Sequence, residues 1–248
     1  MTSVATQNTD IAFISKHKEH LRNYAANIGL YEQGNPERAR LEVFISDIFR
    51  KFYQAEIHQF YPALIAIESD IDDTSQKSSA INAVAGVRCA AEEPLFSEFY
   101  LQNSLESELE NIYKQPVSRS TTVEVGNLAP AHVGQMRWLI AAINGFLYSA
   151  GFKHIVFTAV PNVYNAFKRM NLPLDILIQA KKACLPEDIR DKWGDDYYDL
   201  KPVVLSGDIS KGYHILKNNI YTENQKLIPL FEKACELGRQ FQLKRDVA

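Results

Sequence analysis

One turn of the chain, Pro130-Ala131-His132-Val133-Gly134-Gln135-Met136-Arg137, has residues that could bind an anion. It follows an expected strand that ends in Leu128-Ala129, and it leads into a long helix. Backbone N–H groups at such a helix start lack intrahelical partners and form a site suited to pyrophosphate. Arg137 could add a charged contact to a phosphate. The alternative stays open that the turn only joins a strand to a helix, as many turns do that bind nothing.

The elements that would position this turn form a βαβα unit. Residues 121–129 alternate in part like a strand, with Val123, Val125, Asn127 and Ala129 on one side. In the long helix, apolar residues recur at helical spacing: Met136, Leu139, Ile140, Ile143, Phe146, Leu147 and Ala150. Gly151 would end this helix. A buried strand at His154 to Val160 and a short helix at Asn162 to Met170 complete the unit.

The remaining periodicity predicts one α/β domain. Further helices are expected at Glu37–Tyr53, Glu93–Glu110, Leu177–Cys184 and Lys226–Leu243, and further strands at Tyr61–Ile67, Ile81–Ala90 and Pro202–Leu205. The polar loop between the first two of these strands favours an antiparallel pair. Residues 1–35 are a polar N-terminal segment, either a tail or a first strand, with an apolar patch at 11–14. The domain is expected over 36–220, with an amphipathic helix in 221–248 packed on it.

Composition and charge narrow the classes of function. A chain of 248 residues can bury a core without the help of disulfides or metals. A net charge of -3 gives no reason to expect a nucleic-acid partner. Cys89, Cys184 and Cys235 lack the spacing of a disulfide framework or a metal site. With no signal peptide and no apolar stretch long enough to span a bilayer, we expect a cytoplasmic protein without stable membrane insertion.

The middle of the chain resembles the core of the GNAT superfamily of acyltransferases. The resemblance rests on Glu124-Val125-Gly126-Asn127-Leu128-Ala129, the helix end Ala150-Gly151-Phe152, the strand Ile155-Val156-Phe157-Thr158-Ala159 and the segment Asn165–Leu172. It implies an α/β fold with a mixed sheet flanked by helices. The sequence departs from the superfamily in two ways. The usual Gln/Arg-x-x-Gly-x-Gly/Ala loop is absent, and Phe167 replaces a common tyrosine, so a phenolic general acid is missing there.

Two narrower families share further motifs with this chain. Ala85-Gly86-Val87-Arg88 and Pro94-Leu95-Phe96 resemble the acyl-homoserine lactone (autoinducer) synthases, in which Arg88 and Glu124 match but Asn127 replaces a second arginine. Residues 37–215 resemble the thermostable hemolysin family as a whole. The segments that match the thermostable hemolysin family include Pro94–Leu101, Val123–Ala129, Phe157-Thr158-Ala159 and Trp193-Gly194-x-x-Tyr197-Tyr198. The family name implies a hemolytic phenotype without implying a mechanism.

The resemblance implies roles for three catalytic candidates. Glu124 is expected to act as general base, directly or through water, with a pKa raised by burial in a cleft. The alternative is a structural glutamate paired with Arg88. Arg88 is expected to orient a substrate carboxylate by a bidentate contact. Asn127 could hydrogen-bond substrate or donor, or only cap the end of the strand.

The co-substrate implied by the resemblance is an acyl-CoA or acyl-ACP thioester, with no metal. Gly126 lets a ligand approach the backbone closely, unless it marks only a bulge. The expected cofactor-binding residues are Gly126, Leu128, Ala129, Gly134, Gln135, Met136, Arg137 and Asn162. We therefore expect an N-acyltransferase that moves a fatty acyl group from a thioester of CoA or of acyl carrier protein, which would then be a partner, to a small amine such as an amino acid. The alternatives are a toxin acting directly on membranes and a non-catalytic thioester-binding module.

Overall fold

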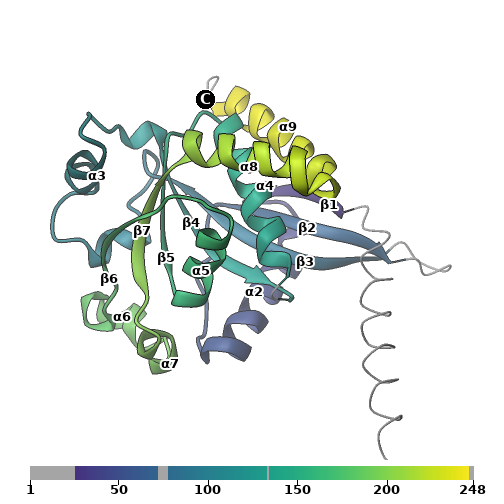
Figure 1. Ribbon diagram of the computed structural model, residues 1–248. Coiled ribbons are helices and arrows are strands. Elements are labelled where there is room, and N and C mark those ends of the chain that lie inside the picture. The colour runs from purple at the N-terminus through teal and green to yellow at the C-terminus, as the bar shows by residue number, and fades with distance from the viewer. Residues whose placement is uncertain (1–25, 72–77, 133, 246–248) are drawn as a thin grey trace, which may run out of the picture.

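A seven-stranded mixed sheet lies at the centre of the chain, in the order β1-β2-β3-β4-β5-β7-β6 (Figure 1). The computed structural model describes residues 26–71, 78–132 and 134–245, and the apolar patch at 11–14 lies outside them. The strands are β1 (Ala26–Glu32), β2 (Ala63–Ile71), β3 (Ser78–Cys89), β4 (Thr122–Pro130), β5 (His154–Ala159), β6 (Asp175–Gln179) and β7 (Val203–Asp208). Only β4 and β5 are parallel neighbours. The predicted α/β class, a mixed sheet flanked by helices, is confirmed.

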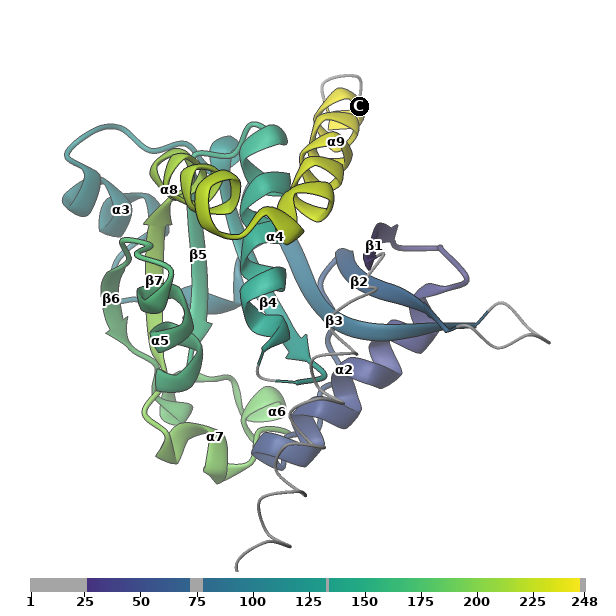
Figure 2. The ribbon, with the colours of Figure 1, turned by 45° about the vertical axis from the view of Figure 1, so that its right-hand side comes forward.

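Helices cover both faces of this sheet (Figure 2). The helices are α2 (Arg38–Tyr53), α3 (Leu105–Tyr113), α4 (Gln135–Ser149), α5 (Pro161–Arg169), α6 (Glu187–Arg190), α7 (Asp195–Asp199), α8 (Ile209–Glu223) and α9 (Ile228–Arg245). The main core joins α4, α5, α8 and α9 to one face of the sheet. The opposite face carries α2 over β2 and β3, and the short 3₁₀-helix η1 (Phe96–Tyr100) with α3 over β5 and β7.

Most predicted elements are confirmed within a few residues. The antiparallel pairing of β2 with β3, the parallel pairing of β4 with β5, and the long α4 all match the expectation. Gly151 ends α4 with φ +81, a conformation that glycine adopts without strain. Of the two alternatives for residues 1–35, the described part forms β1, which pairs with β2. The C-terminal helix α9 is also present, and its Leu230, Phe231, Ala234 and Phe241 are buried in the main core.

Two predicted helices were wrong, and one helix was missed. The single helix expected at Glu93–Glu110 is broken at the extended residue Leu101, and α3 starts anew after Ser104, which accepts a bond from the Ser107 N–H. In place of the helix expected at Leu177–Cys184, residues 177–179 belong to β6, which pairs with β7, and Lys182–Cys184 form a short 3₁₀-helix. A short apolar run does not by itself distinguish a strand from a helix. Helix α8 was not predicted at all.

The predicted alternation of the central strand was also wrong, at its end. Val123 and Val125 face the main core with α4, but Ala129 is buried with α2 on the opposite face. The ladder with β3 shifts register between Gly86, opposite Gly126, and Val84, opposite Ala129. Asn127 lies at this shift with φ +48, a left-handed conformation that asparagine tolerates better than most residues. A bulge therefore bends β4 in the middle of the predicted site.

Candidate active site

The parallel strands β4 and β5 separate after three residue pairs. Thr122, Val123 and Glu124 lie opposite His154, Ile155 and Val156, and no further pair follows. Beyond this point β4 stays with β3 and β5 stays with β7, so the backbones diverge. A hollow lies at this gap, and its volume of about 950 Å³ includes open solvent. Val125 to Leu128 of β4 form one of its sides, and Thr158 and Ala159 of β5, with the Val160 that follows, form another.

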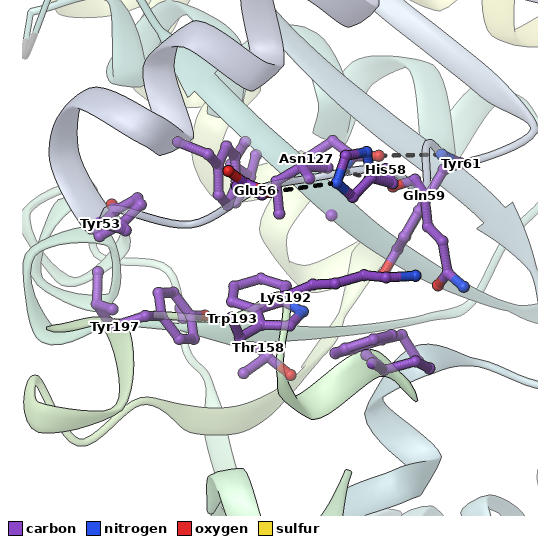
Figure 3. Close-up of a pocket in the computed structure, with 18 of the residues that line it drawn as sticks. Tyr53, Glu56, His58, Gln59, Tyr61, Asn127, Thr158, Lys192, Trp193 and Tyr197 are labelled. Carbon is purple, nitrogen blue, oxygen red and sulfur yellow. Dashed lines mark hydrogen bonds and ion pairs between the residues drawn. The ribbon is translucent and has the colours of Figure 1, made fainter. Parts of the chain in front are cut away.

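Aromatic side chains form part of the wall of the hollow. They come from α2, from η1 and from the 189–197 segment, which packs against the end of α2: Phe49, Tyr53, Phe96, Tyr100, Trp193 and Tyr197. A backbone hydrogen bond from the Glu56 N–H to the Lys192 carbonyl, 3.1 Å long, joins the last segment to the chain three residues after the end of α2. Polar side chains also line the hollow, and Figure 3 shows Lys192 extending between Trp193 and the Glu56–His58 pair. Such a site suits a ligand with an apolar chain and a polar end.

Glu124 is the buried carboxylate of this region, with 1% of its surface exposed. Its oxygens accept hydrogen bonds from the Phe96 N–H (2.8 Å), the Ser97 N–H (2.7 Å) and the Ser97 hydroxyl (2.5 Å). Burial raises the pKa of Glu124, while the bonds from Ser97 and Phe96 and the charge of Arg88 act in the opposite direction. A raised pKa is the shift expected for a general base. The carboxylate does not itself line the hollow.

Tyr61 also lines the hollow. The pKa of Tyr61 is raised well above its usual value by burial, by the negative charge of Glu124 and by a hydrogen bond to it. The ring lies across the cross-strand glycines Gly86 and Gly126. A Cβ on Gly126 would stand 2.5 Å from Tyr61 Cζ, and one on Gly86 would stand 2.7 Å from Tyr61 Cβ. The two glycines therefore form a slot for this side chain.

Asn127 and Arg88 contact Tyr61 as well. The Tyr61 N–H donates to Asn127 Oδ1 at 3.0 Å, and Asn127 Nδ2 donates to the Gln59 carbonyl at 3.4 Å (Figure 3). The Arg88 guanidinium lies 4.4 Å from the centroid of the Tyr61 ring. Its Nε stands 3.2 Å from a Glu93 carboxylate oxygen, and Nη1 donates to the Pro94 carbonyl at 3.4 Å. Although Arg88 and Glu124 are opposite each other on β3 and β4, the ion pair of Arg88 among the described residues is with Glu93.

The structure separates the predicted cofactor-binding residues into two groups. Gly126 and Leu128 line the hollow, together with Asn127. The others do not. Ala129 and Met136 have buried side chains in the core, whereas Gly134, Arg137 and Asn162 are exposed, at the starts of α4 and α5. Gln135 accepts from the His132 N–H and donates to Asn82 Oδ1, both at 3.1 Å.

Sequence reasoning missed Tyr61 and Lys192 and gave Trp193 no role. Tyr61 was placed at the start of a strand, although it precedes β2. The only signal for it is indirect. Glycines inside two strands mark a place where another group comes close to the backbone. No pattern in the sequence indicates that this group is a tyrosine from a preceding loop.

The predicted anion site at residues 130–137 remains a prediction. The start of α4 has no side-chain cap, and Gly134 has no heavy atom within 4 Å of the position a Cβ would take. Among the described residues, no cluster of three or more His, Cys, Asp or Glu side chains is placed to hold a metal ion. None of the helices in the described ranges is long and apolar enough to cross a membrane.

Solved structures with a similar arrangement include enzymes that act on acyl groups. The AHL synthase LasI is 8% identical over 75% of this chain and 91% of its own, with a TM-score of 0.49. BjaI, a CoA-dependent acyl-homoserine lactone synthase solved with SAM and isopentyl-CoA, is 13% identical over 80% and 91%, with a TM-score of 0.49. FeeM, an N-acyl amino acid synthase from uncultured soil microbes, is 8% identical over 76% and 93%, with a TM-score of 0.46. These likenesses are too distant to assign an activity.

The fold and the hollow define an α/β protein with a ligand-sized site in a divided sheet. The thermostable hemolysin family model matches residues 31–213. The chain therefore belongs to the thermostable hemolysin family, as the motifs in its sequence predicted. No curated protein matches this sequence.

Proposed function

We propose that this protein is an N-acyltransferase that moves a fatty acyl group from an acyl-CoA or acyl-ACP thioester to a small amine such as an amino acid. The observation that carries the proposal is the hollow between β4 and β5. It joins unpaired strand backbone, an aromatic wall and a buried carboxylate within one site. Acyl transfer to an amine requires a place for the chain, polarisation of the carbonyl and removal of a proton.

The donor would lie along β4. Val125 to Leu128 have no partner on β5, so backbone N–H groups around the bulge are available to polarise a thioester carbonyl. The acyl chain would occupy the aromatic part of the hollow. The phosphates of the donor would reach the start of α4, where Gly134 and Arg137 are exposed and free N–H groups favour anions.

The acceptor would enter from a neighbouring open groove. This groove shares His58, Gln59, Phe96 and Ile189 with the hollow, and Arg88 lines it. Arg88 would bind the carboxylate of an amino acid, competing with Glu93 for its guanidinium. Glu124 would be the final proton acceptor, because burial already raises its pKa towards the range that a base requires.

The test is an assay of thiol release. Purified protein would be incubated with acyl-CoA and acyl-ACP donors of several chain lengths and a panel of amino acids and other amines. The proposal predicts thiol release that depends on the amine, with an N-acyl product in the mass spectrum. Glu124→Gln should lower kcat by roughly 10²–10⁴-fold. If no pair of donor and acceptor releases thiol, the proposal is rejected. CoA binding without turnover would indicate a non-catalytic thioester-binding module.

A further inference from the structure

We propose that Thr158 is a catalytic residue that passes a proton from the attacking amine, through the Ser97 hydroxyl, to the buried Glu124 carboxylate. This inference rests on the proposed acyltransferase function and assigns two residues that no sequence pattern marked for chemistry. Its starting point is that Glu124, the expected base, does not line the hollow. A proton that leaves the substrate must therefore cross at least one further group before it reaches the carboxylate.

Hydrogen bonds connect the hollow to this carboxylate through two hydroxyl groups. Thr158 lines the hollow, and Figure 3 shows it among the other side chains of the wall. Its Oγ1 lies 3.2 Å from Ser97 Oγ, and Ser97 Oγ lies 2.5 Å from Glu124 Oε1. The Phe96 and Ser97 N–H groups also donate to Glu124, but a backbone amide only donates. A hydroxyl can accept one proton while it gives up another, so the path for a proton runs through Thr158 and Ser97.

The hydroxyl protons of this chain point towards Glu124 while the carboxylate is ionised. Ser97 has a single hydroxyl proton, which it donates to Glu124. Its oxygen is left as an acceptor, and Thr158 therefore donates to Ser97. The oxygen of Thr158 is in turn left to accept from a donor in the hollow, such as an amine N–H. This order of donors and acceptors is the one that carries a proton inwards.

Strand geometry and burial make Thr158 the outer end of the chain. Val156 lies opposite Glu124 in the parallel pair, and Thr158 is two residues further along β5, on the same face. Ser97, from η1 over that face, is fully buried, and Glu124 is 1% exposed. Thr158 is half-buried, and it is the one residue of β5 that is not buried. A substrate in the hollow can therefore contact the first hydroxyl, but neither the second hydroxyl nor the carboxylate.

An ion pair holds η1 in the position that this chain requires. Glu98 accepts from the Leu95 N–H at 2.7 Å, and its two oxygens accept from the Arg119 guanidinium, each at 2.9 Å. Arg119 Nε also donates to the carbonyl of Ala90, the residue after β3, at 2.7 Å. A bidentate contact of this kind fixes geometry as well as adding energy. The sheet thus holds the start of η1, and with it the Ser97 hydroxyl, before substrate arrives.

The proton transfers balance within one catalytic cycle. The amine nitrogen attacks the thioester carbonyl carbon and a C–N bond forms. The amine proton moves to Thr158, as the Thr158 proton moves to Ser97 and the Ser97 proton to Glu124. The C–S bond then breaks, and the sulfur leaves as a thiolate with the bonding electron pair. The thiolate takes a proton from Thr158, and each proton of the chain moves one place back, so Glu124 is ionised again. The products are an amide and a free thiol.

The experiment compares variants of the full chain in the acyl transfer assay. Thr158→Val removes the hydroxyl but keeps the β-branched shape that strands favour, and its methyl group takes the place of the oxygen. Thr158→Ser restores the hydroxyl. Thr122→Val is the matched control, because Thr122 is a fully buried threonine of β4, outside the hollow, whose hydroxyl donates to the Ser118 carbonyl at 2.9 Å. Each variant would be measured for kcat, for KM and for thermal unfolding.

Thr158→Val should lower kcat by about 10²–10⁴-fold, the usual range for lost acid–base catalysis, with KM for the thioester little changed. Thr158→Ser should recover most of this loss, and Thr122→Val should retain kcat. Residues that act as a unit are not additive. The double variant Glu124→Gln/Thr158→Val should therefore lose no more kcat than Glu124→Gln alone.

Several results would overturn this inference while the proposed function stands. The first is an active wild type with Thr158→Val retaining kcat. The second is a double variant in which the two single losses multiply, since Thr158 would then act independently of Glu124. The third is a loss in Thr122→Val as large as that in Thr158→Val. If Thr158→Val is unfolded at the assay temperature, Ser97→Ala cuts the same chain, and kcat retained there is equally contrary. If wild type transfers no acyl group, both proposals fall.

Discussion

Gly126→Ala tests the reasoning about the site through a single added methyl group. Its Cβ would stand 2.5 Å from Cζ and 2.6 Å from the hydroxyl oxygen of Tyr61, whereas carbon atoms in contact are about 3.5–4.0 Å apart. The ring must retreat by about 1 Å, towards the Arg88 guanidinium 4.4 Å from its centroid. Overpacking of this kind costs about 1–3 kcal/mol in the free energy of unfolding. For a domain of this size the Tm would fall by roughly 2–12 °C.

The same displacement should lower activity more than stability. A shift of about 1 Å in a side chain that lines the site can reduce the rate by about 10²-fold. Gly134→Ala is the matched control, because Gly134 has φ -65 and ψ -25 and nothing within 4 Å of the new Cβ. Thermal unfolding and thiol release would be measured for both variants. Gly126→Ala with the Tm and kcat of wild type would refute the view that the glycine makes room for Tyr61.

Three further outcomes are expected. Burial raises the folded-state pKa of Glu124. The difference in free energy of unfolding, wild type minus Glu124→Gln, should therefore fall as pH rises from about 4.3 through that raised pKa. Urea titrations at several pH values would show this, and a rising difference would contradict it. Gly238→Ala should destabilise the fold by about 1–3 kcal/mol, since a Cβ there meets the Phe146 carbonyl of α4, and calorimetry should still show one transition. Pure protein without acyl donor should not lyse red cells, since Leu230, Phe231, Ala234 and Phe241 of α9 are buried in the core, and donor-free lysis would favour a direct toxin.

Local sequence was sufficient for the parts of the fold where one periodicity dominates. The apolar stripe of α4 and the glycine after it predict that helix, and it is buried along one side as the stripe requires. The order strand, turn, helix, strand likewise predicts the parallel pairing of β4 with β5. In these segments the residues that set the secondary structure are also the residues that pack.

The missed elements depend on partners that are distant in the sequence. Residues 175–179 become a strand because β7 offers an edge to pair with, which the apolar run itself does not encode. In β4 the left-handed Asn127 breaks the alternation, and so Ala129 turns to the face opposite that of Val125. A bulge of this kind leaves little trace in a pattern of apolar and polar residues.

The candidate site was predicted in part for the same reason. Glu124, Gly126 and Asn127 follow one another on a strand, so a resemblance to a motif could locate them together. Tyr61 comes from a loop more than sixty residues earlier and reaches the site only through the pairing of β2, β3 and β4. The aromatic wall joins α2 to the 189–197 segment in a similar way. Contacts between residues so far apart in the chain cannot be read from one sequence.

The central claim is that an acyl thioester binds in the gap between β4 and β5, and a crystal structure of the protein with a non-hydrolysable S-alkyl thioether of CoA tests it most directly. The account predicts that the alkyl chain lies among the aromatic side chains around Trp193, with the thioether sulfur beside Gly126 and Asn127. An analogue found elsewhere on the molecule, with this hollow unchanged, would contradict it.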